Sequence, residues 1–246
     1  MNLRKIIKLY KKGNVCVSGL RGSGKDMLTS NVIIRRKKSY MSNVNYGGKY
    51  IPLDFSALDV NNNYKNFISN DVNRFVFPYE NVDIYVSDGG IYFPCQYNNS
   101  LNKEFEGLSV FQALSRQLGN CNFHLNVQSL NRVWDKIREQ SDCYILCNWC
   151  KVLLKKIVIQ KITIYERYDS CINKIRPNRV RKPSIFCSKE VRQQYQLYCD
   201  KFDNENGKIK TMFLIYINKS NYDTRVFKTM LAKFPKATIS LGVPDE

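Results

Sequence analysis

The sequence is short of acidic residues and of histidine, and both shortages limit what the protein can do. Its 21 Asp and Glu residues face 39 Lys and Arg residues, which gives a formal net charge of +18. Solubility does not require so large an excess, so it indicates a polyanionic partner, either nucleic acid or an anionic membrane surface. The one histidine, His124, lies in the middle of a predicted strand, where a structural role is favoured over catalysis.

Long apolar runs are also missing. No stretch of about 18 uncharged apolar residues occurs, so we expect no transmembrane helix. Met1–Lys12 has basic residues but no sustained apolar segment, so we expect no signal peptide. This segment could form a short basic amphipathic helix, although a solvated leader into the first strand is favoured.

What the sequence contains is enough for a packed core. With 246 residues, 43% hydrophobic and 13% aromatic, the chain fits one α/β domain with a small appendage. The nine cysteines are odd in number, and several lie in apolar β-like runs such as those of Cys16, Cys121 and Cys143. This distribution favours buried, reduced thiols in a cytosolic setting.

The most informative stretch follows the apolar run Val15–Val17. It has the order strand, G-x-x-x-x-G-K, helix, with the helix expected from Asp26 to Lys38, and this order is typical of a phosphate-binding P-loop. Its glycines let backbone N–H groups converge on an anion, and the helix N-terminus adds partial positive charge. We therefore predict a triphosphate site with these residues: Gly19, Leu20, Arg21, Gly22, Ser23, Gly24, Lys25, Asp26 and Met27. The alternative is a glycine-rich turn without a ligand.

The residue after the P-loop lysine departs from the motif. A Ser or Thr there normally ligates Mg²⁺, but this chain has Asp26. A carboxylate can hold the metal directly or through water. It also repels the phosphates by roughly 1–4 kcal/mol at about 4 Å unless the metal offsets the charge.

A second acidic residue ends the predicted strand that begins at Val82. Asp88 is followed by Gly89 and Gly90, and P-loop enzymes need an acid at the tip of a strand beside the P-loop to hold Mg²⁺. Asp26 and Asp88 are therefore the predicted metal ligands. The alternative for Asp88 is an Asp-Gly-Gly turn between strands. Gly89 occupies the position at which an acid often polarises the attacking water, so no general base is visible.

The rest of the chain predicts alternating helices and strands. The expected strands are 39–46, 122–128, 143–154, 156–165 and 210–218, and the expected helices are 109–118, 131–140, 188–202 and 222–234. The spacing Cys143-x₃-Cys147-x₂-Cys150 is that of some iron–sulfur sites, but it lies in strand-like sequence. Strand periodicity would send Cys150 to the opposite face from the other two cysteines, which argues against a cluster.

The C-terminal third is strongly basic. Residues 151–192 contain twelve Lys or Arg and three acidic residues, a net charge of +9. Aromatic residues such as Tyr165, Tyr168 and Phe186 are interleaved with these cations, which suits single-stranded nucleic acid. A solvated basic surface or a membrane-facing patch is the alternative. We divide the chain into a P-loop NTPase domain, 1–165, and a basic C-terminal region, 166–246, that packs on the core or continues it.

Between Val15 and Leu154 the chain resembles the zonula occludens toxin-like family of P-loop ATPases, which includes the gene I assembly protein of filamentous phages. The resemblance rests on the P-loop, Asn43, Asp88 and the spacing of three later residues, Arg116, Gln128 and Arg138. It implies an α/β P-loop NTPase fold, with a mostly parallel sheet flanked by helices. It also implies an ATP- and Mg²⁺-dependent motor or scaffold in the host cytoplasm, at the inner face of the membrane. The phage-type function is extrusion or packaging of a phage genome and virion assembly, with single-stranded phage DNA, coat proteins and host membrane components as partners.

The resemblance also implies roles for the site residues. Lys25 would contact the β- and γ-phosphates, Asp88 would hold Mg²⁺, and Gln128 would sense the γ-phosphate. Arg138, ahead of Arg116 or Arg132, would reach a neighbour's nucleotide as an arginine finger in a ring-like homo-oligomer.

Two alternatives remain open. Gly89 stands where the family usually has Glu, and Asp26 replaces Ser or Thr, so a nucleotide-binding scaffold without useful turnover competes with an ATPase. A membrane-surface adaptor that uses Met1–Lys12 is the third hypothesis.

Overall fold

The computed structural model describes residues 3–53, 81–92, 109, 112–113, 120–154, 156–177 and 180–219. Within these ranges the helices are α1 Leu3–Lys12, α2 Lys25–Arg36, α5 Gly89–Tyr92, α7 Asp135–Arg138, α8 Tyr168–Ile172 and α9 Lys189–Asn206, with a 3₁₀ turn, η1, at Leu130–Arg132. The strands are β1 Val15–Ser18, β2 Tyr40–Ser42, β3 Tyr50–Pro52, β4 Asp83–Val86, β5 Phe123–Val127, β6 Cys143–Leu153, β7 Ile157–Tyr165 and β8 Ile209–Ile217.

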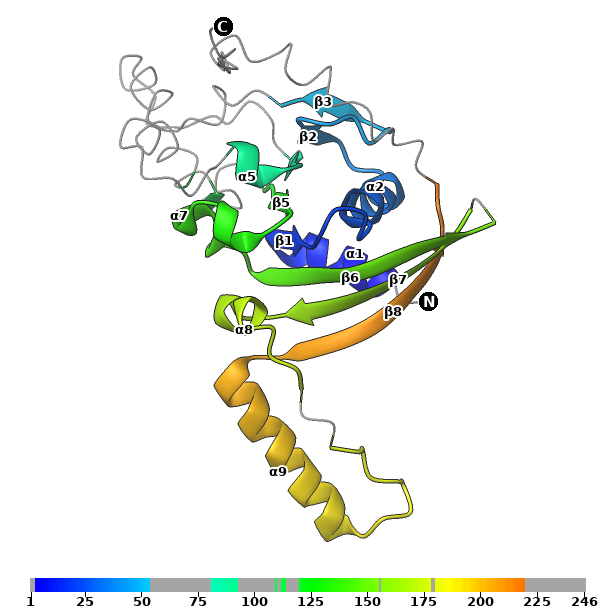
Figure 1. Cartoon of the computed structure of the whole chain (residues 1–246), viewed down its shortest axis with the longest axis vertical. Helices are drawn as coiled ribbons and strands as arrows, with labels where there is room; N and C mark the ends of the chain where they lie inside the picture. The colour runs from blue at the N-terminus through cyan, green and yellow to red at the C-terminus, as the bar shows by residue number, and fades with distance from the viewer. Residues whose placement is uncertain are drawn as a thin grey trace, which may run out of the picture.

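The described strands form one sheet of eight in the order β3-β2-β4-β5-β1-β6-β7-β8 (Figure 1). The first six strands in this order are parallel, and β7 and β8 are antiparallel. This arrangement confirms the predicted α/β P-loop fold with a mostly parallel sheet. The strand that precedes Asp88, β4, is separated from the P-loop strand β1 by β5.

Apolar side chains cover both faces of the sheet. On one face α1 and α2 pack against β1, β6, β7 and β8 through residues such as Leu28, Val32 and Leu214. On the other face α7, α8 and η1 pack against β4, β5 and β6 through residues such as Leu130 and Ile137. This double covering explains why the parallel strands read as continuous apolar runs in the sequence.

The N-terminal segment is a helix, not the solvated leader that we favoured. Leu3, Ile6 and Tyr10 lie at helical spacing and are buried in the core, whereas the lysines between them are exposed. Burial against the sheet supplies the stability that a ten-residue helix lacks in isolation. Its apolar face is used inside the protein, so this segment does not offer that face to a membrane.

The predicted helix 131–140 was also wrong. The chain forms η1, passes through extended Val133 and then makes the single turn α7. Val133 and Ile137 are fully buried, so tertiary packing determines the backbone here and overrides a regular helical pattern. The predicted strand 39–46 is shorter than expected, since only Tyr40–Ser42 pair.

The predicted strands 143–154 and 156–165 are confirmed as β6 and β7, which pair as an antiparallel hairpin from Tyr144↔Tyr165 to Leu153↔Ile157. The expected orientation of Cys150 was wrong. The register shifts between Cys147 and Trp149, and this bulge returns Cys150 to the face of Cys143 and Cys147. All three thiols are free, and no group of three potential metal ligands occurs in the described ranges.

The C-terminal part of the described chain contributes α9 and β8. Ser188 caps α9 by accepting a hydrogen bond from the backbone N–H of Val191, and β8 pairs with β7 as the edge strand of the sheet. Figure 1 shows α9 projecting away from the sheet and from the other helices. None of the described helices is both long and apolar enough to cross a membrane. The predicted helix 222–234 and most of 109–118 lie outside the described residues.

Candidate nucleotide site

The loop between β1 and α2 has the backbone that the glycine-rich sequence predicts. Gly22 and Gly24 have φ values of 78° and 83°, in the left-handed region that favours glycine. Gly24 precedes the first turn of α2, and no side chain caps this end of the helix. The first N–H groups of α2 therefore have no side-chain acceptor, as expected for an anion-binding helix N-terminus.

The strand β6 packs directly against the loop. A Cβ on Gly19 would lie 2.5 Å from the carbonyl oxygen of Cys147, and a Cβ on Gly24 would lie 2.8 Å from Cβ of Cys150. These glycines are thus required by close packing as well as by backbone conformation. Burial raises the pKa of the Cys147 thiol to about 12, so it is a protonated apolar neighbour of the loop.

Lys25 lies at the centre of the loop. Its side chain is 6% exposed, and Nζ donates hydrogen bonds to the carbonyl oxygens of Gly19 and Leu20 at 2.9 and 3.2 Å. The ammonium group is therefore held inside the curve of the loop. The remaining loop residues are arranged around it: Leu20, Arg21 and Gly22 are exposed, Ser23 is buried, and Met27 packs against the core.

Asp26 is bound into a polar network that the sequence does not reveal. Its Oδ1 accepts hydrogen bonds from Tyr46 Oη, Ser87 Oγ and Asn126 Nδ2 at 3.0, 2.9 and 3.0 Å. Asn126 in turn accepts a hydrogen bond from Thr29 of α2 at 3.0 Å. One carboxylate oxygen of Asp26 is thus saturated by three donors, which fixes the side chain at the end of β4 and β5.

Asp88 lies beside Asp26 in a strained backbone. Its φ is 50°, and the preceding residue, Ser87, is fixed by Asn43, whose amide exchanges two hydrogen bonds with the Ser87 backbone at 2.8 and 2.9 Å. Partial burial and the neighbouring carboxylate of Asp26 raise the pKa of Asp88, and Lys25 and a hydrogen bond from Gln128 lower it. The predicted residues Lys25, Asp26, Asp88 and Gln128 are therefore brought together.

Asn43 supports this site through the backbone of Ser87. It belongs to the turn after β2, and its amide positions the backbone immediately before Asp88. The sequence marked Asn43 only as part of the family resemblance. Its spacing gave no indication of this positioning role.

Gly89 is fixed by packing. A Cβ at this position would lie 2.3 Å from Cδ1 and 3.0 Å from Cγ of Leu125, and 3.2 Å from Cγ1 of Val127. Any larger residue requires these core side chains of β5 to move. Position 89 therefore lacks an acidic side chain, and the packing around it leaves no room for one.

Gln160 is a supporting residue that the sequence analysis missed. This residue of β7 is fully buried, and its Nε2 donates to the carbonyl oxygens of Ser23 and Gly24 at 3.0 and 3.2 Å. Its Oε1 accepts a hydrogen bond from the Tyr216 hydroxyl of β8 at 3.0 Å. These contacts hold two loop carbonyls toward the sheet. A polar residue between Val158 and Ile162 at the alternate positions of this strand was the only available signal.

The predicted arginines are placed differently from one another. Arg138 Nη1 donates to the carbonyl oxygens of Leu130 and Val133 at 3.3 and 3.2 Å, and the guanidinium lies 5.0 Å from the ring centre of Tyr168. Arg132 is exposed, and its Cβ lies where it would contact a side chain at Gly90. Arg116 lies outside the described residues. The arginine-finger role stays a prediction.

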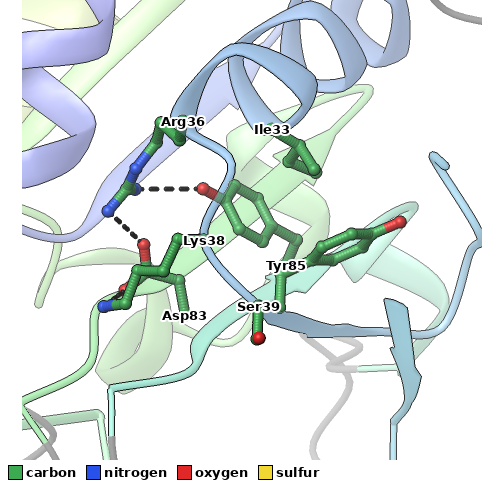
Figure 2. Close-up of a pocket in the computed structure, with 7 residues that line it drawn as sticks. Ile33, Arg36, Lys38, Ser39, Asp83 and Tyr85 are labelled. Carbon is green, nitrogen blue, oxygen red and sulfur yellow. Dashed lines mark hydrogen bonds and ion pairs between the residues drawn. The ribbon is translucent and has the colours of Figure 1, made fainter. Parts of the chain in front are cut away.

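The opposite end of β4 contains a second polar cluster. Asp83 is 1% exposed and pairs with Arg36 and with Lys38, the latter at 2.8 Å. Figure 2 shows Arg36 between Asp83 and Tyr85, beside a small pocket at the end of α2. Two cations near the end of α2, Arg36 and Lys38, are thus paired within the protein.

His124 lies next to this cluster, and its ring contacts the rings of both Tyr10 and Tyr85. Its Nδ1 accepts a hydrogen bond from the backbone N–H of Val15 at 3.2 Å. Burial and the nearby cations lower the pKa of His124 well below its usual value, so this imidazole is neutral and structural.

The donor atoms beside Lys25 suit magnesium. Mg²⁺ prefers oxygen ligands and is commonly bound by one or two carboxylates together with substrate phosphates. Asp26 and Asp88 supply two carboxylates with one neighbouring lysine, and burial together with the charge of Asp26 raises the pKa of Asp88. A divalent cation would relieve that repulsion, so the residues present fit this ion.

No protein-family model matches the chain, and no curated protein matches it. Among solved structures, the N-terminal domain of zonular occludens toxin from Neisseria meningitidis is 10% identical, covers 88% of this chain and 97% of that domain, and has a TM-score of 0.42. The genome packaging NTPase B204 from Sulfolobus turreted icosahedral virus 2, solved with AMP, is 14% identical over 55% of this chain and 74% of that one, with a TM-score of 0.37. ATPases 2 and 3 of EssC from Geobacillus thermodenitrificans are 10% identical over 90% of this chain and 43% of that one, with a TM-score of 0.41. The toxin named in the sequence resemblance is thus represented among the solved structures similar to this chain.

Proposed function

We propose that this protein binds ATP with Mg²⁺ at the C-terminal edge of its parallel sheet. The observation that carries the proposal is the convergence of Lys25 with the carboxylates of Asp26 and Asp88 at an uncapped helix N-terminus. A cation and free backbone N–H groups suit a polyphosphate, and two adjacent carboxylates suit its metal. Phosphate-binding groups and metal-binding carboxylates lie side by side here, which suits a polyphosphate that binds together with its metal ion.

Each residue then has a defined task. The N–H groups of the loop and Lys25 bind the phosphates, and Asp88, with Asp26, holds the metal. When bound, Mg²⁺ supplies positive charge that neutralises the phosphate oxygens. Gln128 follows β5, the strand beside β1, and it hydrogen-bonds Asp88, so it is positioned to respond to the terminal phosphate.

For the biological role we propose a phage-type ATPase of the host cytoplasm that drives or organises DNA extrusion or packaging. The sequence resemblance motivates this role, and the exposed cations of the C-terminal part support a nucleic-acid partner. Arg176, Arg181 and Lys182 are exposed, and Phe186, which is 92% exposed, is available for stacking on a base. A homo-oligomer is part of this proposal.

The second candidate is a nucleotide-binding assembly scaffold with little turnover. Two observations favour it. A side chain at Gly89 would collide with Leu125, and Oδ1 of Asp26 is already saturated by three donors. The membrane-surface adaptor loses its motivation because the apolar face of α1 is buried.

The first experiment measures ATP binding and steady-state ATP hydrolysis with Mg²⁺, with and without single-stranded DNA. In Lys25→Ala the loss of charge-assisted hydrogen bonds should weaken ATP binding by roughly 10- to 100-fold. Lys12→Ala, an exposed lysine of α1, is the matched control. Turnover that DNA stimulates and Lys25→Ala abolishes supports the motor. Binding without turnover supports the scaffold, and unchanged affinity in Lys25→Ala contradicts both.

A second experiment separates motor from scaffold. Gly89→Glu alone would be confounded by the collision with Leu125, so the carboxylate is introduced together with Leu125→Ala, which removes the colliding atoms. Leu125→Ala alone is the matched control for the cavity. A large gain in turnover in the double variant over this control supports the scaffold as the natural state. Equal turnover in the two variants counts against the missing general base as the cause.

A further inference from the structure

The three charged side chains at the centre of the nucleotide site carry an excess of negative charge. Lys25 contributes one positive charge, and Asp26 and Asp88 contribute two negative ones, so their formal balance is −1. A P-loop with Ser or Thr after its lysine lacks the charge of Asp26 and balances at zero. The N-terminus of α2 offsets only about half a charge. A polyphosphate that approaches this loop therefore meets one carboxylate more than an ordinary P-loop presents.

The charge of these carboxylates is not neutralised by a direct contact. In the described ranges neither Asp26 nor Asp88 takes part in an ion pair. Lys25 Nζ donates to two carbonyl oxygens of the loop, at 2.9 and 3.2 Å. The other cation of the loop, Arg21, is exposed, so solvent screens its charge. Both carboxylates thus remain available to a cation from solution.

The carboxylate of Asp26 is held in position by the protein itself. Its Oδ1 accepts hydrogen bonds from the hydroxyls of Tyr46 and Ser87 and from the amide of Asn126, at 3.0, 2.9 and 3.0 Å. All three donors are uncharged, so they orient the carboxylate without neutralising it. Its Oδ2 accepts no hydrogen bond from a described residue. A metal ligand that is already ordered loses little conformational entropy when the ion binds.

Asp88 is attached to the same network. Ser87, which donates to Asp26, directly precedes Asp88, and the amide of Asn43 fixes the Ser87 backbone at 2.8 and 2.9 Å. Gln128 hydrogen-bonds the side chain of Asp88. Contacts within the chain therefore order both carboxylates, and no nucleotide is needed to assemble them.

The phosphate-binding half of the site is less complete. Ser23 is 4% exposed, and its Oγ has no hydrogen-bond partner among the described residues. The first N–H groups of α2 have no side-chain acceptor either. Polar groups of this kind are normally satisfied, so they indicate a ligand of the loop. The chain alone thus assembles its metal ligands, whereas these loop donors are left for an anion.

We propose that this site takes up its divalent cation before the nucleotide, and that the bound cation admits the phosphates. The inference rests on the proposed ATP site. It departs from the usual P-loop, in which a neutral hydroxyl and the phosphates share the metal. With a divalent cation the formal balance of the site becomes +1, which attracts a polyphosphate, whereas the balance of −1 without it repels one. Supply of the metal therefore controls nucleotide binding.

Metal binding by the full-length chain without nucleotide is the first test. Titration with Mn²⁺, followed by the electron paramagnetic resonance signal of the free ion, should show a bound ion that Mg²⁺ displaces. Asp26→Asn keeps an oxygen for the three donors but replaces Oδ2 by an NH₂ group, so Mn²⁺ affinity should fall about tenfold or more. Asp135→Asn makes the same change at an exposed position and should bind Mn²⁺ like the wild type.

The dependence of nucleotide binding on the metal is the second test. A fluorescent ATP analogue should bind the wild type about tenfold or more weakly in EDTA than with Mg²⁺. In EDTA, Asp26→Asn should bind the analogue about fivefold or more tightly than the wild type, because one negative charge beside the phosphates has been removed. If Asp26→Asn does not fold by circular dichroism, Asp26→Ser, which restores the usual motif residue, takes its place in both tests.

The other outcomes overturn the inference. If about 1 mM Mn²⁺ does not bind the nucleotide-free chain, the cation arrives with the nucleotide. If Asp26→Asn binds Mn²⁺ like the wild type, the ion is held elsewhere, and if the two bind the analogue equally in EDTA, Asp26 does not exclude phosphates. Failure of the ATP site is recognised separately: the chain would then bind Mn²⁺ through Asp26 but bind no nucleotide with Mg²⁺, and metal control of nucleotide binding would fall with it.

Discussion

Strand β4 has an aspartate at its beginning and another just after its end, and their surroundings are opposite. Asp83 is almost fully buried, pairs with two cations and accepts a hydrogen bond from the backbone N–H of Asn122 at 3.2 Å. Asp88 is half-buried beside a second carboxylate, with Lys25 as a cation close enough to lower its pKa. The comparison shows how a structural carboxylate differs from a ligand site: one has its charge neutralised inside the chain, and the other has charge left for a ligand.

The largest effect on stability is expected when the ion pairs of Asp83, at the start of β4, are removed. Asp83→Ala leaves Arg36 and Lys38 without their shared carboxylate, and Arg36 is held in the interior by Tyr10 and Tyr85. Loss of one partner of a buried ion pair costs about 3–5 kcal/mol, so we expect the free energy of unfolding in urea to fall by that amount. ATP affinity per folded molecule should not change, because the cluster lies at the other end of the strand. Asp135→Ala, at an exposed position, is the control, and a loss below about 1 kcal/mol would contradict the assignment.

An intermediate effect is expected where the antiparallel strands support the phosphate loop. Gln160→Leu removes the donor for the carbonyl oxygens of Ser23 and Gly24 and leaves the Tyr216 hydroxyl without its acceptor. Buried polar groups without partners cost about 1–3 kcal/mol, so stability should fall by that amount. ATP affinity should also fall, since the loop backbone is no longer held.

The double variant Gln160→Leu with Tyr216→Phe sharpens this test. It removes the orphaned hydroxyl and should regain part of the stability but none of the ATP affinity. Stability is measured by urea denaturation and affinity by titration with a fluorescent ATP analogue. Recovery of both quantities together would mean that Gln160 acts on stability alone.

The sequence predicted the parts of this comparison that depend on local patterns. The P-loop, Asp88 at the end of β4 and Gln128 at the end of β5 follow from strand periodicity, glycine turns and motif spacing, all within a few residues. Helix α1 was misjudged because its stability comes from burial against strands far along the chain. The insertion of β5 between β1 and β4 is likewise a property of the whole sheet.

The supporting contacts could not be predicted for the same reason. Asp26 is bound by residues 20, 61 and 100 positions away, and Gln160 reaches a loop 136 or 137 positions away. Contacts between residues so far apart along the chain follow no motif or periodicity that can be seen in a single sequence. Gly89 is similar, since its conflict with Leu125 is visible only once α5 lies on β5.

The smallest effect on stability is expected at Asp88, just after the end of β4, and it should be a gain of stability and not a loss. The folded-state pKa of Asp88 is raised above its usual 3.8, so its ionised form destabilises the metal-free fold at neutral pH. Asp88→Asn should therefore increase stability slightly, by about 0.5 kcal/mol at pH 7. The gain is small because Asp88 is half-exposed, so solvent reduces both the cost of its burial and the repulsion from Asp26. The difference between variant and wild type should vanish as pH falls below 3.8, where the carboxyl is protonated in both states.

ATP with Mg²⁺ should reverse the order of stability of the wild type and Asp88→Asn. With ATP and Mg²⁺ present, the wild type gains a ligand that Asp88→Asn binds poorly, so its thermal midpoint should rise more than that of the variant. ATP without Mg²⁺ should bind the variant at least as well, because one negative charge near the phosphates has been removed. Asp135→Asn serves as the exposed control. A variant that is destabilised without metal, as Asp83→Ala is expected to be, would place Asp88 in the same structural class as Asp83 and remove the distinction between the two ends of β4.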